Sequence, residues 1–266
     1  ANAIGKWILE GGDIIRSRIE KYDIKCDLKQ GNIFTAFSEK QMREFESKIA
    51  LWKRHGMDHL ELLDKNELRK HVGSNVYVGG LRDPRGGHIH PLNLALGEAA
   101  ALEANGGVIY EQTRVTSIKH DSRGGVAHTA NGQVRAKKLV VCGNAYLGNA
   151  VPELTSKVMP VSTQIIATEP LTEQQAQSIL PSDHCVEDSN YMLDYFRLSG
   201  DRRLLFGGGS TYGGAEPSDI IAKLQPHVKK VFPQLEDVKF DFAWSGNFAL
   251  TVTRIPHMGK MGDNVY

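Results

Sequence analysis

Two histidines separated by a single residue are the first side chains in this sequence with the spacing of a chemical site. His88 and His90 follow Asp83, and an H-x-H pair at the end of a strand can supply two metal ligands at once, as in a metal-dependent hydrolase. A catalytic metal needs further ligands, and the other histidines stand at no recognisable ligand spacing. Ordinary positions in a loop and at a helix start therefore compete with this interpretation, and we predict that the chain holds no metal.

No other group of residues has the spacing of a hydrolytic centre. The sequence contains neither a nucleophile triad nor a pair of carboxylates at catalytic spacing. Two alternatives to a cofactor-dependent enzyme stay open at this point. One is a metal-dependent hydrolase that uses His88 and His90, and the other is a non-catalytic interaction domain.

Composition restricts the class of partner. The 266 residues are 41% hydrophobic and 24% charged, and 32 Lys and Arg nearly balance 31 Asp and Glu without any block of like charge. This pattern argues against nucleic acid and against an anionic membrane surface, so a small molecule is the expected partner. No apolar run approaches the roughly 20 residues that cross a bilayer. Cys26, Cys142 and Cys185 form no C-x-x-C pair, which favours a reducing, cytoplasmic location.

Hydrophobic periodicity and turn residues predict the elements that position these side chains. In the first part we expect a helix over residues 4–19, a strand over 32–37 and a helix from Ser38 to about residue 55, because Ser38 and Gln41 have the spacing of a capping box. A short helix should start at Asp64. A strand at 76–81, a turn at 83–87 and a helix that begins with Pro91 should follow, with Leu92, Ala95, Leu96, Ala99 and Leu102 on one face.

The remaining pattern predicts a small meander and then a larger sheet. The meander strands are expected at 108–110, 115–120, 126–129, 133–135 and 139–142. Beyond Pro152 we expect strands at 159–168, 184–187, 191–198, 204–206 and 238–244, with helices at 172–179 and 218–231. The predicted class is α/β (α+β), with a mixed, largely antiparallel sheet and flanking helices.

Several stretches, taken in order, resemble the D-amino-acid-oxidase-like FAD-dependent oxidoreductases, the group that contains glycine and sarcosine oxidases. The stretches are Gly87-His88-Ile89-His90-Pro91, residues 106–115, residues 139–146 and the run that begins Trp244-Ser245-Gly246. The resemblance covers nearly the whole chain. It implies a partial FAD-binding domain formed by residues 1–30, 76–151 and 246–266, and a substrate-binding domain formed by residues 31–75 and 152–245.

The resemblance also implies which residues contact the cofactor. Val115 would hold the adenine end of FAD through its backbone, and Gly143, followed by Asn144 and Ala145, would let the main chain approach the cofactor closely. The family's G-x-G-x-x-G unit and its last glycine-rich segment are missing, and the run from Gly207 to Ser210 lacks the dinucleotide spacing. We therefore expect the central part of a longer flavoenzyme, which alone binds FAD poorly and self-associates through exposed apolar surface.

The activity that the resemblance implies is oxidation of an amine. Hydride passes to FAD, the imine hydrolyses, and oxygen reoxidises the flavin, so the protein's own tasks are positioning and exclusion of water. Aromatic walls suit these tasks, and we expect them from Tyr191, Tyr195 and Trp244, with Tyr191 and Tyr195 on one strand face. Aromatic residues in strands are, however, mostly ordinary core.

One departure from the family pattern bears on the substrate. Amino-acid oxidases of this group often carry W-x-G-x-R-P, in which the arginine pairs with the substrate carboxylate, whereas this sequence has Phe248 there. We therefore expect an amine without an adjacent carboxylate, with gamma-glutamylputrescine from putrescine catabolism as the best candidate. Arg254 is the expected contact for a distant carboxylate, and no catalytic residue can be assigned.

Overall fold

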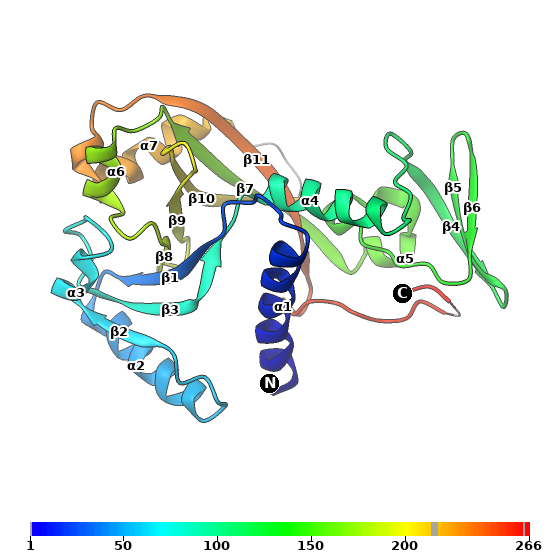
Figure 1. The fold of residues 1–266 in the computed structure, drawn as a ribbon, viewed down its shortest axis with the longest axis horizontal. Helices are drawn as coiled ribbons and strands as arrows, with labels where there is room; N and C mark the ends of the chain where they lie inside the picture. The colour runs from blue at the N-terminus through cyan, green and yellow to red at the C-terminus, as the bar shows by residue number, and fades with distance from the viewer. Residues whose placement is uncertain (1, 214–217, 263) are drawn as a thin grey trace. The chain divides into compact units, whose positions relative to one another are not determined.

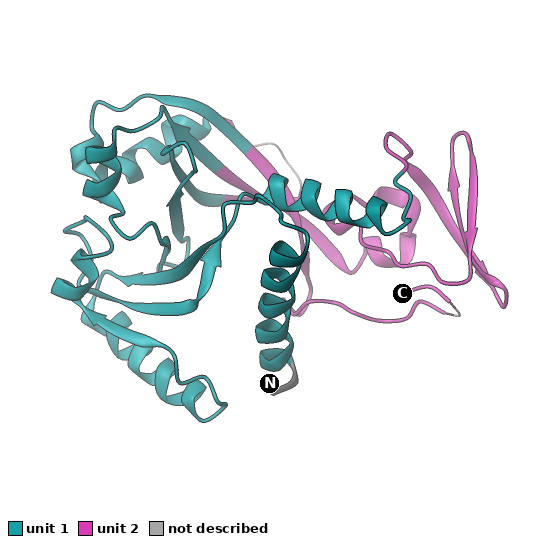
Figure 2. Cartoon of the chain, viewed as in Figure 1, with its two compact units in different colours: residues 1–109, 165–209, 219–244 teal, residues 110–164, 210–218, 245–266 magenta. Residues whose placement is uncertain are grey.

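The computed structural model describes residues 2–213, 218–262 and 264–266, and it divides the chain into two compact units. Unit 1 contains residues 1–109, 165–209 and 219–244, and unit 2 contains residues 110–164, 210–218 and 245–266 (Figure 2). These boundaries follow compactness and differ from the functional division expected from the sequence, which stays a prediction. Within the described part of the chain, no helix combines the length and apolarity needed to cross a membrane.

An eight-stranded sheet is the framework of the fold (Figure 1). Its strands lie in the order β11 (Phe240–Thr251), β7 (Val158–Thr168), β10 (Leu204–Tyr212), β9 (Asp194–Leu198), β8 (Cys185–Asp188), β1 (Lys29–Ala36), β3 (Gly79–His88) and β2 (Glu61–Asp64). The β1–β8 pair is parallel, whereas β1–β3, β2–β3, β8–β9 and β9–β10 are antiparallel. This arrangement confirms the predicted mixed, largely antiparallel sheet.

One face of the central strands is the core of unit 1. Alternate residues along β8 and β9 are buried, and they pack with α6 (Glu173–Ile179), α7 (Ile220–Val231) and the 3-10 turn η3 (Pro233–Leu235). Phe196 stacks on Phe206 with ring centroids 5.4 Å apart and meets Phe232 edge-on at 5.1 Å. The alternation follows from the two-residue period of a strand and leaves the opposite face half-buried.

Helix caps form where the local sequence predicts them. Ser38 caps α2 (Glu39–Lys53) by accepting a hydrogen bond from the Gln41 N–H, although the Gln41 side chain reaches the N–H of Phe37 rather than that of Ser38. Asp64 closes a full capping box on α3 (Lys65–Arg69), and Thr172 does the same on α6. Each cap satisfies backbone donors that the first helical turn leaves unpaired.

The turn expected at residues 83–87 is instead a bulge inside β3. Asp83 pairs with Asn32 and Gly87 pairs with Gln30, so three residues of β3 lie opposite the single residue Gly31. Proline and glycine weaken a strand without ending it when the extra residues can be accommodated in a bulge. The bulge carries Arg85, whose guanidinium lies 3.3 Å from Asp13 on α1 (Asn2–Lys21).

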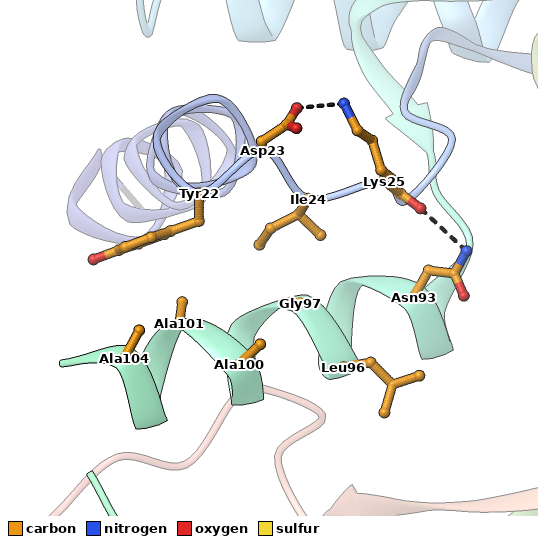
Figure 3. A pocket seen from close by; sticks show the side chains of 10 residues that line it. All are labelled: Tyr22, Asp23, Ile24, Lys25, Asn93, Leu96, Gly97, Ala100, Ala101 and Ala104. Carbon is orange, nitrogen blue, oxygen red and sulfur yellow. Dashed lines mark hydrogen bonds and ion pairs between the residues drawn. The ribbon is translucent and has the colours of Figure 1, made fainter. Parts of the chain in front are cut away.

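Helix α4 (Pro91–Ala104) begins with Pro91 as predicted, but its apolar side is largely open. Leu92, Leu96 and Leu102, which were predicted to share one face, are 61%, 58% and 50% exposed. The end of α1 and the residues after it lie along the helix, where Tyr22, Ile24 and Lys25 line a pocket of about 550 Å³ with small residues of α4 (Figure 3). A Cβ on Gly97 would come within 2.3 Å of Ile24, so glycine permits this approach.

Unit 2 contains a three-stranded antiparallel meander. Its strands are β4 (Val115–Asp121), β5 (Gly124–Thr129) and β6 (Gly132–Ala136), as predicted. The strand expected at 108–110 is absent from this described segment, and the one expected at 139–142 is reduced to a parallel bridge between Leu139 and Val265. The short helices η1 (Asn144–Tyr146), η2 (Gly148–Ala150) and α5 (Pro152–Thr155) connect the meander to β7.

Candidate functional site

Tyr195 lies on the half-buried face of the sheet, which we define by Asn32, Cys185, Glu187, Tyr195 and Arg197. Its cross-strand partners are Glu187 on β8 and Gly207 on β10. A Cβ added to Gly207 would lie 2.1 Å from Cε2 of Tyr195, so the ring extends over the bare backbone of β10. The sequence fixes the ring there because glycine leaves room that no other residue leaves.

A polar network occupies the neighbouring strands of the same face. The Asn32 amide donates to Oε1 of Glu187 at 3.3 Å, and its oxygen accepts from the thiol of Cys185 at 3.2 Å. Burial, and next the charge of Glu187, raises the pKa of Cys185 to about 11, so the thiol stays protonated at neutral pH. Asn32 and Glu187 were not found from the sequence, because they converge only through the β1–β8 register.

The H-x-H histidines serve the fold. Nε2 of His88 lies 2.9 Å from the carbonyl oxygen of Asp183, which makes it the protonated nitrogen, and Nδ1 lies 3.4 Å from the Arg197 guanidinium. Burial lowers the pKa of His88. His90 caps α4 by accepting from the N–H of Asn93. No group of three His, Cys, Asp or Glu side chains among the described residues is placed to hold a metal ion.

Asp194 shows how sharply the two faces of β9 differ. It directly precedes Tyr195 but lies on the helix side, where both carboxylate oxygens are within 3.0 Å of Nδ1 of His227 on α7. Burial raises its pKa, and the hydrogen bond from His227 opposes that rise. A Cβ on Gly208 would lie 2.4 Å from this carboxylate. The glycine pair in β10 thus leaves space for a ring on one face and an acid on the other.

Tyr191, one of the expected pocket walls, does not share a strand face with Tyr195. Strand β9 begins at Asp194, whereas Tyr191 lies in the preceding turn and is 88% exposed, so the predicted strand over 191–198 is wrong at its start. The turn frees Tyr191 from the alternation that would have aligned it with Tyr195. Trp244 lies in β11 and is 41% exposed.

In unit 2 the expected cofactor residues form a tight turn that is hydrogen-bonded to β11. Oδ1 of Asn144 accepts from the N–H of Ala249 at 2.7 Å, and the hydroxyl oxygen of Tyr146 accepts from the N–H of Asn247 at 3.0 Å. Phe248, which is 38% exposed, lies between these two anchored residues. The structure thus brings a predicted cofactor residue and a predicted pocket residue together.

The backbone of this turn has a shape suited to an oxygen-rich group. Gly143 is right-handed, with φ −90° and ψ −1°, and Asn144 is left-handed, with φ 49°. Such an alternation turns successive N–H groups toward one concavity that accepts anionic oxygen. A Cβ on Gly143 would lie 2.3 Å from the Leu147 side chain, so the close approach made by this glycine is internal to the turn. The turn fits a phosphate or carbonyl oxygen of a cofactor such as FAD.

Val115 and Arg254 complete the predicted set. Val115 is the first residue of β4 and is half-buried, next to a bulge in the β4–β5 ladder. Arg254 is exposed in the turn after β11, where it has φ 59° and its N–H donates to the carbonyl of Thr251. The roles expected for both residues stay predictions.

Comparison with known proteins gives one family over the whole chain. The family model described as "FAD dependent oxidoreductase" matches residues 1–266. The chain is 49% identical over 267 residues to gamma-glutamylputrescine oxidoreductase of Escherichia coli K12, and 38% identical over 272 residues to the probable oxidoreductase OrdL of Haemophilus influenzae. Each alignment covers 100% of this chain and 62% of the relative. The chain therefore spans less than two thirds of the length of these relatives.

Solved structures show the same fold at lower identity. Glycine oxidase from Geobacillus kaustophilus superposes with a TM-score of 0.81 at 22% identity, covering 99% of this chain and 70% of that one. L-proline dehydrogenase from P. horikoshii gives a TM-score of 0.83 at 18% identity, covering 97% and 71%.

Proposed function

The chain belongs to the FAD-dependent oxidoreductase family, and on this basis we propose that the protein oxidises a small amine with FAD as its cofactor. The observation that supports an amine without an α-carboxylate is the position of Phe248. It lies between Asn247 and Ala249, whose N–H groups donate to Tyr146 and Asn144 of the turn. An apolar ring stands there in place of an arginine that would pair with an α-carboxylate. Family membership favours this function over a metal hydrolase and over an interaction domain.

The proposed roles of the side chains follow from their placement. Val115, Gly143, Asn144 and Ala145 hold the cofactor, with the N–H groups of the left-handed turn directed to its oxygen atoms. FAD, when bound, supplies the acceptor for the hydride that leaves the amine's carbon. The protein itself orients that carbon and excludes water.

Aromatic residues form the proposed substrate pocket. Tyr195, supported by the bare backbone of Gly207, has the strongest structural argument. Tyr191, Trp244 and Phe248 are the further walls, and Arg254 contacts a distant carboxylate of the substrate. We assign residues 1–30, 76–151 and 246–266 to the FAD-binding part and residues 31–75 and 152–245 to the substrate-binding part.

The proposed substrate is a primary or secondary amine without an adjacent carboxylate, with gamma-glutamylputrescine as the best candidate. Support comes from Phe248 and from the 49% identity to a protein named gamma-glutamylputrescine oxidoreductase. The imine product hydrolyses in water, and oxygen is the proposed final electron acceptor. We place the enzyme in the cytoplasm, where the free thiols of Cys26, Cys142 and Cys185 would be maintained.

An anaerobic reduction experiment tests this function. The flavin-loaded protein is mixed with gamma-glutamylputrescine or with glycine, and the loss of the flavin absorption band is followed in time. We expect faster bleaching with gamma-glutamylputrescine. Faster bleaching with glycine would refute the proposed substrate class. The absence of any flavin band from the purified full-length protein, rather than from this chain alone, would refute the flavoenzyme itself.

A further inference from the structure

Glu187 is a carboxylate without a cationic partner on the face that carries Tyr195. It is half-buried in β8, and its side chain receives the hydrogen bond from Asn32. Within the described residues, no Lys, Arg or His nitrogen lies within 4.0 Å of its oxygens. A carboxylate that is partly removed from water and has no counter-ion is stabilised when a cation binds beside it.

Arg197 is the cation that the strand register brings nearest, and it is engaged elsewhere. Because Glu187 pairs with Tyr195, and Val186 with Phe196, Arg197 lies on β9 at the level of Cys185. Its guanidinium donates to the carbonyl of Leu198 at 3.0 Å and lies 3.4 Å from Nδ1 of His88. The position beside Glu187 is therefore not filled by the arginine.

The two partners of the β8–β9 pair lean in opposite directions. The Glu187 side chain extends toward β1, where Asn32 holds it, while the Tyr195 ring extends over Gly207 of β10. Since the strand order is β10, β9, β8, β1, each side chain lies over the outer neighbour of the pair. The carboxylate and the ring therefore flank the backbone of β8 and β9 from both sides.

We propose that Glu187 is a specificity-determining residue that binds an ammonium group of the substrate, with the Tyr195 ring on the other side of the bound chain. This inference rests on the proposed amine oxidation. A carboxylate supplies charge-assisted hydrogen bonds to an ammonium, and the aromatic ring gives the rest of the bound chain an apolar surface to pack against. Asn32 positions the carboxylate by its hydrogen bond.

The ammonium bound by Glu187 is a second one, distant from the carbon that loses hydride. Oxidation requires the neutral form of the reacting amine, whereas a nearby carboxylate favours the charged form and would raise that amine's pKa. The preferred substrates are accordingly amines with an additional positive charge, such as diamines and their derivatives.

Matched amines test this specificity in the flavin-loaded protein. Glu187→Gln keeps an oxygen that accepts from Asn32 but removes the charge. We expect it to raise KM for 1,4-diaminobutane about tenfold or more, with kcat little changed, and to leave KM for 1-aminobutane within about twofold. Glu61→Gln is the control, because it removes a strand carboxylate on β2 that pairs with Arg82 instead. An equal rise for both amines, or none, would overturn the assignment.

Binding of an unreactive cation separates this inference from the proposed function. Tetramethylammonium carries the charge without being a substrate, and its dissociation constant can be measured by calorimetry. We expect E187Q to weaken its binding at least fivefold relative to wild type and to E61Q. Weaker binding in E187Q supports Glu187 even if no amine, gamma-glutamylputrescine included, is oxidised, a result that would refute the proposed function alone. Equal binding by wild type and E187Q rejects the role of Glu187 whatever the turnover.

Discussion

Asn144 accepts a hydrogen bond from the backbone N–H of Ala249 at 2.7 Å, which fixes the turn after the Leu139–Val265 bridge to the last strand of the large sheet. Asn144 is also in the left-handed region, with φ 49°, where asparagine is tolerated better than most residues. One residue type thus meets a conformational and a hydrogen-bonding demand together.

Replacement of Asn144 should show how much these two features together stabilise the fold. N144A loses the acceptor and puts alanine, which tolerates positive φ less well than asparagine, at this position. We therefore expect a loss of about 2 kcal/mol in the free energy of unfolding. N144D keeps an acceptor and should remain within about 0.5 kcal/mol of wild type. Urea denaturation of the flavin-free protein measures both. Equal stability of N144A and wild type would contradict the importance of this contact.

The position of the Tyr195 ring should depend on Gly207, which lies beneath it. In G207A the new Cβ would lie 2.1 Å from Cε2 of Tyr195, so the ring must leave its position. We expect kcat/KM for the amine to fall about tenfold, since small misplacements of positioning groups are costly, while flavin content is retained. G246A is the control, because no atom lies within 4 Å of its new Cβ. Unchanged kinetics of G207A would remove Tyr195 from the pocket.

A charge at position 248 should change the substrate class. In F248R the guanidinium can pair with a carboxylate next to the reacting amine. We expect the ratio of kcat/KM for glycine to that for gamma-glutamylputrescine to rise about tenfold or more. F248L tests whether the loss of the ring alone has this effect. The same rise in F248L would show that the arginine position has no role in carboxylate selection.

Stability should fall in acid because of a pair of histidines joined by one serine. Ser182 Oγ lies 2.9 Å from Nδ1 of His71 and 3.2 Å from Nδ1 of His184, and the two rings stack 5.3 Å apart. Burial, and next the charge of His71, lowers the pKa of His184 to about 4, and burial also lowers the pKa of His71. The folded state therefore binds these protons at a lower pH than the unfolded chain does.

The sign of the effect follows from this order of protonation. The unfolded chain binds the proton near pH 6.5, so the contribution of His184 is fully present above that pH and is lost as the pH falls toward about 4. The loss should be on the order of 2 to 3 kcal/mol. Denaturation curves recorded at a series of pH values give the free energy of unfolding as a function of pH. Between about pH 4 and 6.5 this free energy should fall less steeply for H184Q than for wild type and for the exposed-site control H55Q. Parallel slopes in all three proteins would refute the assignment.

Exposed apolar side chains should cause self-association of the 266-residue chain. Trp7 and Ile8 on α1 are 54% and 68% exposed, and Leu92 and Leu96 on α4 are similarly open. Light scattering should show species larger than a monomer as the concentration rises. I8K should reduce association, whereas S17K adds the same charge on the same helix without removing apolar surface. A clean monomer at high concentration would contradict this prediction.

Local signals in the sequence were sufficient for elements that are determined locally. Ser38, Asp64 and Thr172 begin their helices because their side-chain oxygens bond to N–H groups two or three residues later. The hairpin between β5 and β6 is also local, because only Ala130 and Asn131 lie between the paired residues Thr129 and Gly132.

Elements that depend on distant partners were predicted less well. Residues 108–110 are β-branched or aromatic but are not assigned to a strand, and residues 139–141 find their partner only at the far residues 264–266. The candidate site shows the same limit. Tyr195 follows from the family pattern, whereas Glu187 and Asn32 become neighbours through strand order and register, which no short motif encodes.

The bulge in β3 has a consequence for how ionic strength affects the first helix. Arg85 on the bulge and Arg16 on α1 both contact the carboxylate of Asp13, and Arg16 also donates to the Arg85 carbonyl at 3.3 Å. The pair with Arg16 is the main cause that lowers the pKa of Asp13. All three groups face water, where the Debye length is about 10 Å in 0.1 M salt and about 3 Å in 1 M salt. Concentrated electrolyte should therefore loosen the attachment of α1 to the sheet while leaving the buried aromatic cluster intact.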